Sequence, residues 1–147
     1  LKGTNLPIAL SPLVGKGPGL TPLGDDFIVG VAAGMEAHPN SRNFISFWLN
    51  SIVEKTTALS GKALHYASYG WFIEPIVEFV NNLSDMSQME KPIPLLTIGD
   101  TSGIAMTYGC VVGFQIGKNL DKNTGTDKSD CSISRPIPNY SPDNQAA

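Results

Sequence analysis

Two apolar segments of this chain carry glycines four residues apart, and this spacing limits how the segments can fold. Gly30 and Gly34 lie in the first segment, and Gly109, Gly113 and Gly117 lie in the second. Glycine inside a helix costs about 0.5–1 kcal/mol relative to alanine, because glycine loses more conformational freedom on folding. Residues four apart share one face of a helix. Because glycine has no side chain, the backbone on that face of each segment is uncovered. We therefore predict two helices that pack closely against each other.

A loop rich in glycine, threonine and aspartate leads into each of these helices. The first loop reads GKGPGLTPLGDD, from Gly15 to Asp26, and the second reads LLTIGDTSG, from Leu95 to Gly103. The first N–H groups of a helix lack helical partners and sit at its positive end, where phosphate and carboxylate bind readily. If the helices run parallel, both loops meet at one end and form one pocket. The alternative is that the glycines serve only turns and packing.

The remaining pattern is mainly helical, and strand signals are scarce. We expect loop over residues 1–24, with one short strand at Pro7–Leu10. Apolar periodicity, N-cap residues and prolines place the expected helices at Asp26–Ala37, from Ser41 onward, at Thr57–Tyr69, at Glu74–Leu83 and at Ser102–Lys118. The predicted fold is a compact, mainly α domain over residues 1–118 with few or no strands, followed by a polar, proline-containing tail over 119–147.

Composition excludes several classes of function. The chain has 147 residues, of which 41% are hydrophobic and 16% charged, as expected for a globular domain. Its net charge of −3 provides no basic field for nucleic acid or an anionic membrane. No apolar run reaches the roughly 18 residues that span a bilayer, and no secretory signal opens the chain. Cys110 and Cys131 are expected as free thiols, which favours a cytoplasmic location.

Asp25 and Asp26 are the candidate catalytic residues, because adjacent carboxylates at a helix start can act as a base or bind Mg²⁺. The alternative is that Asp25 caps the first helix and Asp26 favours its positive end. No cofactor is predicted, since no His or Cys cluster has metal-ligand spacing. The candidate substrate-binding residues supply N–H groups, hydroxyls or charge near the helix starts: Lys16, Gly17, Gly19, Thr21, Gly24, Thr57, Ser60, Thr101, Ser102 and Gly103.

Three segments resemble one bacterial family. GKGPGLTPLGDDF is similar to the signature G-x-G-P-G-L-T-P-S-G-D-D-F of that family. TTALSGKALHYASYG, from Thr56 to Gly70, and LLTIGDTSGIAMTYGCVVGF, from Leu95, resemble its second and third blocks in the same order. Leu23 stands where the family usually has serine, and Asp100 where histidine is common. Members include the AllH-type subunit of oxamate carbamoyltransferase.

The resemblance implies a function in anaerobic allantoin and purine catabolism. The enzyme interconverts oxalurate plus phosphate with oxamate plus carbamoyl phosphate, and it needs two other subunit types. The expected partners are therefore a small anionic metabolite and other protein subunits. Two alternatives stay open: a non-catalytic module that binds a small anion, and a structural subunit whose loops serve only packing.

Overall fold

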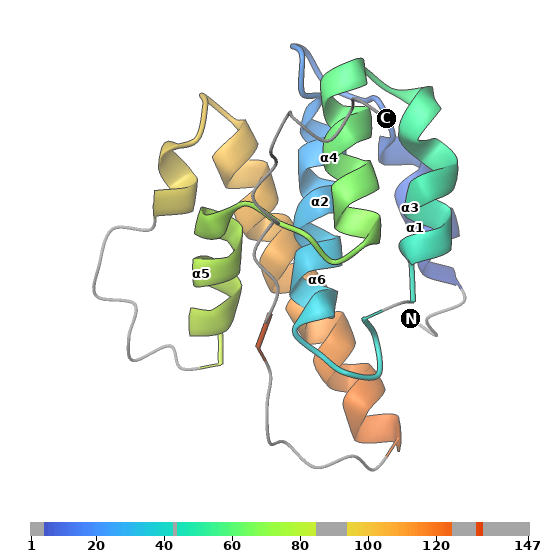
Figure 1. Ribbon diagram of the computed structural model, residues 1–147, viewed down its shortest axis with the longest axis vertical. Helices are drawn as coiled ribbons and strands as arrows, with labels where there is room; N and C mark the ends of the chain where they lie inside the picture. The colour runs from blue at the N-terminus through green and yellow to red at the C-terminus, as the bar shows by residue number, and fades with distance from the viewer. Residues whose placement is uncertain (1–4, 43, 85–93, 125–131, 134–147) are drawn as a thin grey trace, which may run out of the picture.

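The computed structural model describes residues 5–42, 44–84, 94–124 and 132–133, and these are mainly helical, with no β-strand among them (Figure 1). The α-helices are α1 (Leu6–Leu10), α2 (Leu23–Glu36), α3 (Ser46–Ile52), α4 (Ala58–Ser68), α5 (Glu74–Asn82) and α6 (Ser102–Thr124). Short 3-10 turns lie between them: η2 (Ser11–Leu13), η3 (Val53–Lys55) and η5 (Pro94–Thr97). The mainly α fold predicted from the sequence is confirmed.

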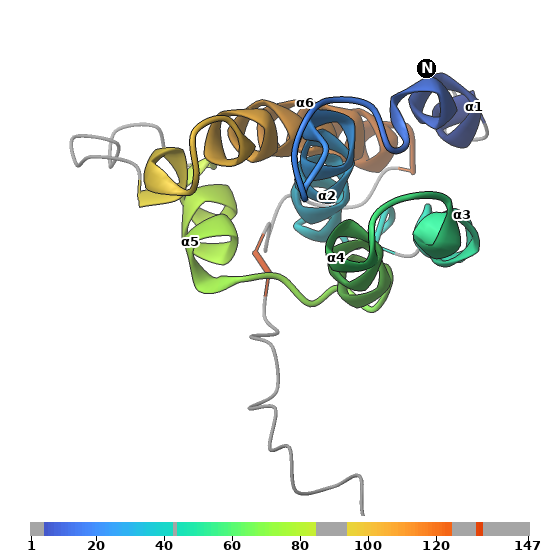
Figure 2. The same ribbon diagram turned by 90° about the horizontal axis from the view of Figure 1, so that it is seen from above.

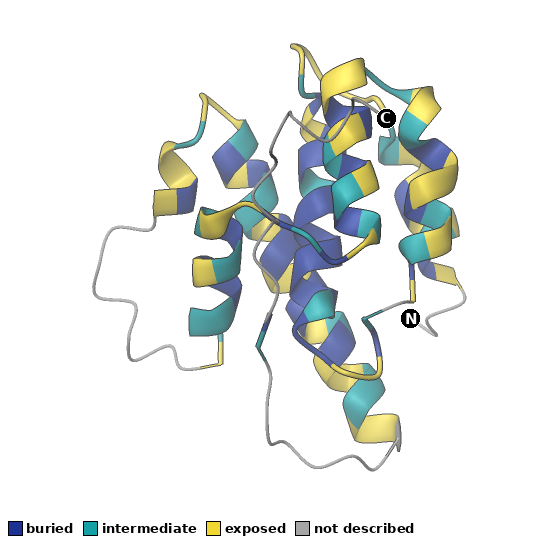
Figure 3. Ribbon diagram, viewed as in Figure 1, coloured by how far each residue is buried: buried dark blue, intermediate teal, exposed yellow. Residues whose placement is uncertain are grey.

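Helix α2 occupies the centre of the molecule. It packs along α6, and α4 and α5 contact its other sides (Figure 2). Nearly the whole of α2 is buried, as Figure 3 shows, with Ile28 and Val31 fully inaccessible to solvent. Burying each such aliphatic side chain stabilises the fold by about 1.5–3 kcal/mol. Polar groups on α2 are therefore held inside the protein, and each needs a partner or a function.

The predicted close packing of the two glycine-bearing helices is confirmed. A Cβ atom added at Gly30 would lie 2.2 Å from the Met106 carbonyl oxygen and 3.0 Å from the Gly109 Cα. A Cβ atom at Gly113 would lie 2.0 Å from the Val31 carbonyl oxygen. Only glycine permits these backbones to touch, since real Cβ atoms do not approach so closely. Contacts advance in the same direction along both helices, so α2 and α6 run parallel.

The far ends of α2 and α6 are joined by a buried histidine. His38 follows α2, and its Nδ1 lies 2.7 Å from Asp121 Oδ2 on α6. The side-chain amide of Asn40 donates to the other oxygen of Asp121 at 2.9 Å. Gly117 leaves room for the imidazole, because a Cβ there would lie 2.4 Å from His38 Cδ2. His38 therefore has a structural role, because it holds the end of α2 against α6.

Several predicted boundaries are wrong. Pro7–Leu10 is helical in α1 rather than extended, because Pro7 lies in the first turn, where its missing N–H costs nothing. Helix α2 begins at Leu23 rather than Asp26, since Pro22 takes the N-cap position.

Ser41 begins no helix. Its hydroxyl donates to the Met35 carbonyl at 2.7 Å, so it satisfies the end of α2 instead. Helix α6 continues past Lys118 to Thr124.

Part of the predicted tail can be described. Ile133 is buried in the hydrophobic core, and its N–H donates to the Asn81 side chain at 2.9 Å. Residues 125–131 and 134–147, with Cys131 among them, lie outside the described residues. In the described part of the chain, no helix is long and apolar enough to cross a membrane.

Candidate functional site

The N-termini of α2, α4 and α6 lie at the same end of the molecule, at the top of Figure 1. Hydrogen bonds connect the loop before α2 to the starts of α4 and α6. Thr21 Oγ1 lies 3.1 Å from Ser102 Oγ at the start of α6. The Thr57 hydroxyl, at the N-cap of α4, donates to the Leu20 carbonyl at 2.6 Å. Because each helix has the positive end of its dipole here, the junction favours an anion.

The first glycine-rich loop has a backbone that other residues adopt rarely. Gly15, Gly17 and Gly19 have φ angles of 67°, 117° and 93°. These positive values fold the loop back onto the start of α2, where the Gly24 N–H donates to the Lys16 carbonyl at 2.8 Å. Among the described residues, no acceptor is bonded to the N–H groups of Gly17 and Gly19. These two groups remain available to a ligand.

Asp25 holds the loop in place. The side chain is 1% exposed, and its Oδ1 accepts the Gly15 N–H at 2.8 Å. Its Oδ2 accepts the hydroxyl of Thr56, immediately before α4. The alternative that Asp25 caps α2 is wrong, because Pro22 is the N-cap and no side chain caps it. With both oxygens engaged inside the protein, Asp25 joins the loop to the start of α4.

Asp26 is equally buried but, unlike Asp25, it is not fully hydrogen-bonded. The residue is 3% exposed, and its Oδ2 has no hydrogen-bond partner in the described structure. Burial raises the pKa of this carboxyl above its usual 3.8, and the neighbouring Asp25 charge raises it further. Hydrogen bonds from the Ser102 and Thr21 hydroxyls lower it, but burial outweighs them. Asp26 therefore lies against the hydroxyl pair that joins α2 to α6.

A second buried group without a partner lies on α4. Thr57 caps this helix by accepting the Ser60 N–H at 3.2 Å, which confirms the predicted helix start. The Ser60 hydroxyl is buried, at 2% exposure of the residue, and has no partner among the described residues. A buried hydroxyl without a hydrogen bond costs roughly 1–3 kcal/mol, so a bound ligand that satisfied it would recover that energy.

Gly24 and Gly103 serve packing. A Cβ on either would lie 2.0 Å from a carbonyl oxygen, that of Leu13 for Gly24 and that of Leu95 for Gly103. Their N–H groups are also engaged, since Gly103 donates to the Ile98 carbonyl at 2.9 Å and Gly24 donates within its own loop. Both glycines hold their loops against the helices rather than offering a donor to a ligand.

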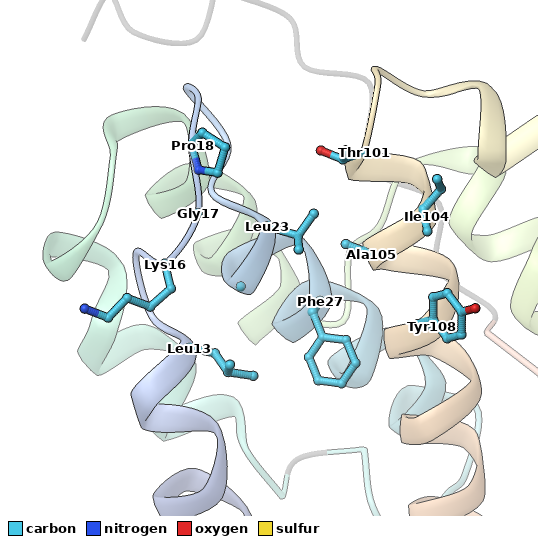
Figure 4. A pocket seen from close by; sticks show the side chains of 11 residues that line it. Leu13, Lys16, Gly17, Pro18, Leu23, Phe27, Thr101, Ile104, Ala105 and Tyr108 are labelled. Carbon is cyan, nitrogen blue, oxygen red and sulfur yellow. The ribbon is translucent and has the colours of Figure 1, made fainter.

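An open groove of about 840 Å³ lies beside this polar junction, between the first loop, α2 and α6 (Figure 4). Its walls are nearly all apolar. In Figure 4, Pro18 and Thr101 stand at its mouth, and the amino group of Lys16 extends away from α6. The lining residues are Leu13, Lys16, Gly17, Pro18, Leu23, Gly24, Phe27, Thr101, Ile104, Ala105 and Tyr108.

A comparison with family models decides the assignment. The model described as oxamate carbamoyltransferase subunit AllH matches residues 13–114. The chain belongs to the AllH family. The match runs from the end of η2 into α6 and includes both glycine-rich loops and α4. No solved structure matches the chain.

The structure of this AllH family member groups the predicted site residues in three ways. Thr21, Asp26 and Ser102 meet at the junction, and Thr57 and Ser60 lie at the adjoining start of α4. Lys16, Gly17 and Thr101 line the groove. Gly19 is exposed, with open space around it. The family resemblance leads us to expect serine where Leu23 stands, and Leu23 contributes an apolar side chain to the groove wall.

Sequence reasoning missed the apolar groove. Leu23 and Phe27 on α2, and Ile104 and Tyr108 on α6, are pairs four residues apart, so each pair lies on one helix face. This four-residue spacing can be seen in the sequence, but it is equally typical of apolar residues that face the hydrophobic core of a protein. In the part of the chain that the structure describes, no three His, Cys, Asp or Glu residues gather in a way that would hold a metal ion.

Proposed function

We propose that this AllH family member is a subunit of a carbamoyltransferase and binds a small anionic substrate where α2, α4 and α6 begin. Oxamate, oxalurate and carbamoyl phosphate are the candidate substrates, in keeping with the family's description. The observation that carries the proposal is the contact of Thr21 with Ser102, two residues separated by 81 positions. Through it, both glycine-rich loops contribute to one site.

The available donors suit carbamoyl transfer. This reaction needs the phosphate held and the carbonyl polarised by groups that are already oriented. The N–H groups of Gly17 and Gly19 and the Ser60 hydroxyl have no partner in the described structure. The starts of α4 and α6 lie at the same end of the molecule as this loop (Figure 1). A carboxylate or phosphoryl group supplies oxygen acceptors of the kind that these donors need.

Positive charge is scarce at this site, and this supports a multi-subunit enzyme. Arg42 is engaged elsewhere, where it donates to the carbonyls of Glu36 and Ser132 at 3.1 and 3.2 Å. Lys16 is exposed, and its amino group extends away from α6 (Figure 4). A phosphate dianion is usually matched by arginine or lysine. We infer that another subunit supplies this cation.

Calorimetry tests the proposal. The full chain, alone and assembled with its partner subunits, would be titrated with oxamate, oxalurate, phosphate and carbamoyl phosphate. Ser102→Ala and Thr21→Val should weaken binding by roughly 10- to 100-fold, as loss of a hydrogen bond to a charged group does. Ser51→Ala is the control, since that exposed hydroxyl lies on α3 and bonds to the Trp48 carbonyl of the same helix. Failure of both preparations to bind any of the four anions would disprove the proposal.

The second candidate function is a non-catalytic or structural subunit of the same complex. The nearly apolar groove beside the site favours it, because an apolar surface suits contact with protein more than with a small anion. Turnover by the assembled complex separates the two functions. If Ser102→Ala weakens anion binding but leaves turnover unchanged, the chain senses the anion rather than taking part in the reaction.

A further inference from the structure

Asp26 is a buried carboxyl group with no ion-pair partner in the part of the chain that the structure describes. In the described structure, its Oδ2 has no hydrogen-bond partner, and it forms no salt bridge. Asp25, on the same helix, is the other buried ionisable group near it. The charged residues on the loop, η3, α4 and α5, and before α6, are exposed: Lys16, Glu54, Lys55, Lys62, Glu74, Glu78 and Asp100. The other titratable groups on α4 and α6 are His65, Tyr66, Tyr108, Cys110, Lys118, Asp121 and Lys122, of which Cys110 is buried.

We propose that Asp26 is a neutral carboxylic acid in the ligand complex and donates a hydrogen bond to an oxygen of the bound anion. The proposal rests on the proposed function, because it names the partner of the anion at that same site. Two observations support the proposal. Asp26 is buried beside Thr21 and Ser102, and its Oδ2 has no hydrogen-bond partner in the described structure. The substrate class follows: an anion that presents an oxygen acceptor to a hydroxyl pair and a carboxylic acid.

Charge decides which form of Asp26 can accompany an anion. If Asp26 were ionised, its charge, that of Asp25 and that of the ligand would lie together in a region of low dielectric. Like charges a few ångströms apart repel strongly in such a region. Protonation removes one of these charges and turns Oδ2 from an acceptor into a donor. One proton from solvent therefore enters the site with each anion and stays on Asp26.

The hydroxyl groups fit this arrangement. Thr21 and Ser102 hydrogen bond to each other, so one of the two O–H groups is used in that contact. The remaining hydroxyl O–H is then directed at the Asp26 carboxyl group. The Asp26 O–H is directed at the ligand oxygen. Burial already shifts the pKa of Asp26 upward, so less free energy is needed to protonate it on binding.

Oxamate is the probe for the test, because its carboxylate does not titrate between about pH 5.5 and about pH 8.5. Above the pKa of Asp26 in the free protein, the Kd of the wild type should rise about tenfold per pH unit. Asp26→Asn keeps a neutral donor and should bind with a Kd that does not change with pH. His65→Gln is the control, since it removes an exposed imidazole on α4, away from the junction, and should leave the pH dependence unchanged.

Infrared difference spectroscopy is the second readout. The wild-type oxamate complex should show the carbonyl band of a protonated carboxyl group, and the Asp26→Asn complex should lack it. A wild type that binds oxamate without that band overturns this inference and leaves the proposed function standing. If neither the chain nor its assembled complex binds oxamate or the other anions, the proposed function itself fails.

Discussion

Thr21 and Ser102 lie 81 positions apart in the sequence, yet their hydroxyl oxygens are 3.1 Å apart. The parallel contact of α2 with α6 produces this proximity, because it places the starts of both helices at the same height. Asp26 completes the group, because the hydroxyls of Thr21 and Ser102 both lie close to its carboxyl group. The predictions below test the packing that creates this junction and the groups that lie in it.

The first prediction concerns the glycine contact. Gly109→Ala should destabilise the fold by more than the roughly 1–3 kcal/mol typical of overpacking, because the new Cβ would lie 2.2 Å from the backbone oxygen of Phe27. Urea unfolding measures the change. Gln115→Ala, on an exposed position of the same helix, is the control and should be nearly neutral. Equal stability of the two variants would contradict the close packing.

The second prediction concerns Asp25. Asp25→Asn should lower stability by roughly 1–3 kcal/mol and loosen the loop, because an amide nitrogen cannot accept the Thr56 hydroxyl or the Gly15 N–H. Thr56→Val should have a smaller effect, and the double variant should lose less than the sum of the two. Urea unfolding and proteolysis at the loop provide the measurements. Strict additivity would show that the two side chains do not interact.

The third prediction concerns pH and Asp26. Its pKa is raised in the folded state, so the folded protein binds more protons than the unfolded chain between the unfolded and folded pKa values. Stability from this residue is therefore greatest at low pH and falls as pH rises toward the folded pKa. Asp26→Asn should be more stable than the wild type near neutral pH, and the gain should shrink toward about pH 4. Melting temperatures measured across this range check the sign, and a gain that grew toward acid would contradict it.

The fourth prediction concerns Cys110. The thiol is fully buried on α6, and burial raises its pKa to about 12. At about pH 8, only about one thiol in ten thousand would be ionised, and the thiolate is the reactive form. Iodoacetamide should modify Cys110 in urea but not in the native protein, as mass spectrometry of the Cys110 peptide would show. Rapid native labelling would mean that α6 opens locally.

The sequence indicated the parts of the site but not all of their boundaries. Glycine spacing and hydroxyl-rich helix starts were sufficient to predict the central helix pair and the start of α4 near Thr57. The start of α2 was misplaced because aspartate is the commoner N-cap, whereas here Pro22 occupies that position and Asp25 is used by the loop. Ser41 was misread for a similar reason, since a serine hydroxyl can satisfy the end of one helix as well as the start of the next.

The sequence by itself determined that two glycine-striped helices pack closely, because helical glycine is costly unless another backbone occupies the space. The identity of the AllH family was also present in its motifs. Only the tertiary structure decided that α2 and α6 run parallel. It also decided that the adjacent residues Asp25 and Asp26 differ in their hydrogen bonding. Asp25 is fully hydrogen-bonded and Asp26 keeps a buried oxygen unpaired. Adjacent residues on a helix point about 100° apart, so what each meets depends on which elements pack around it.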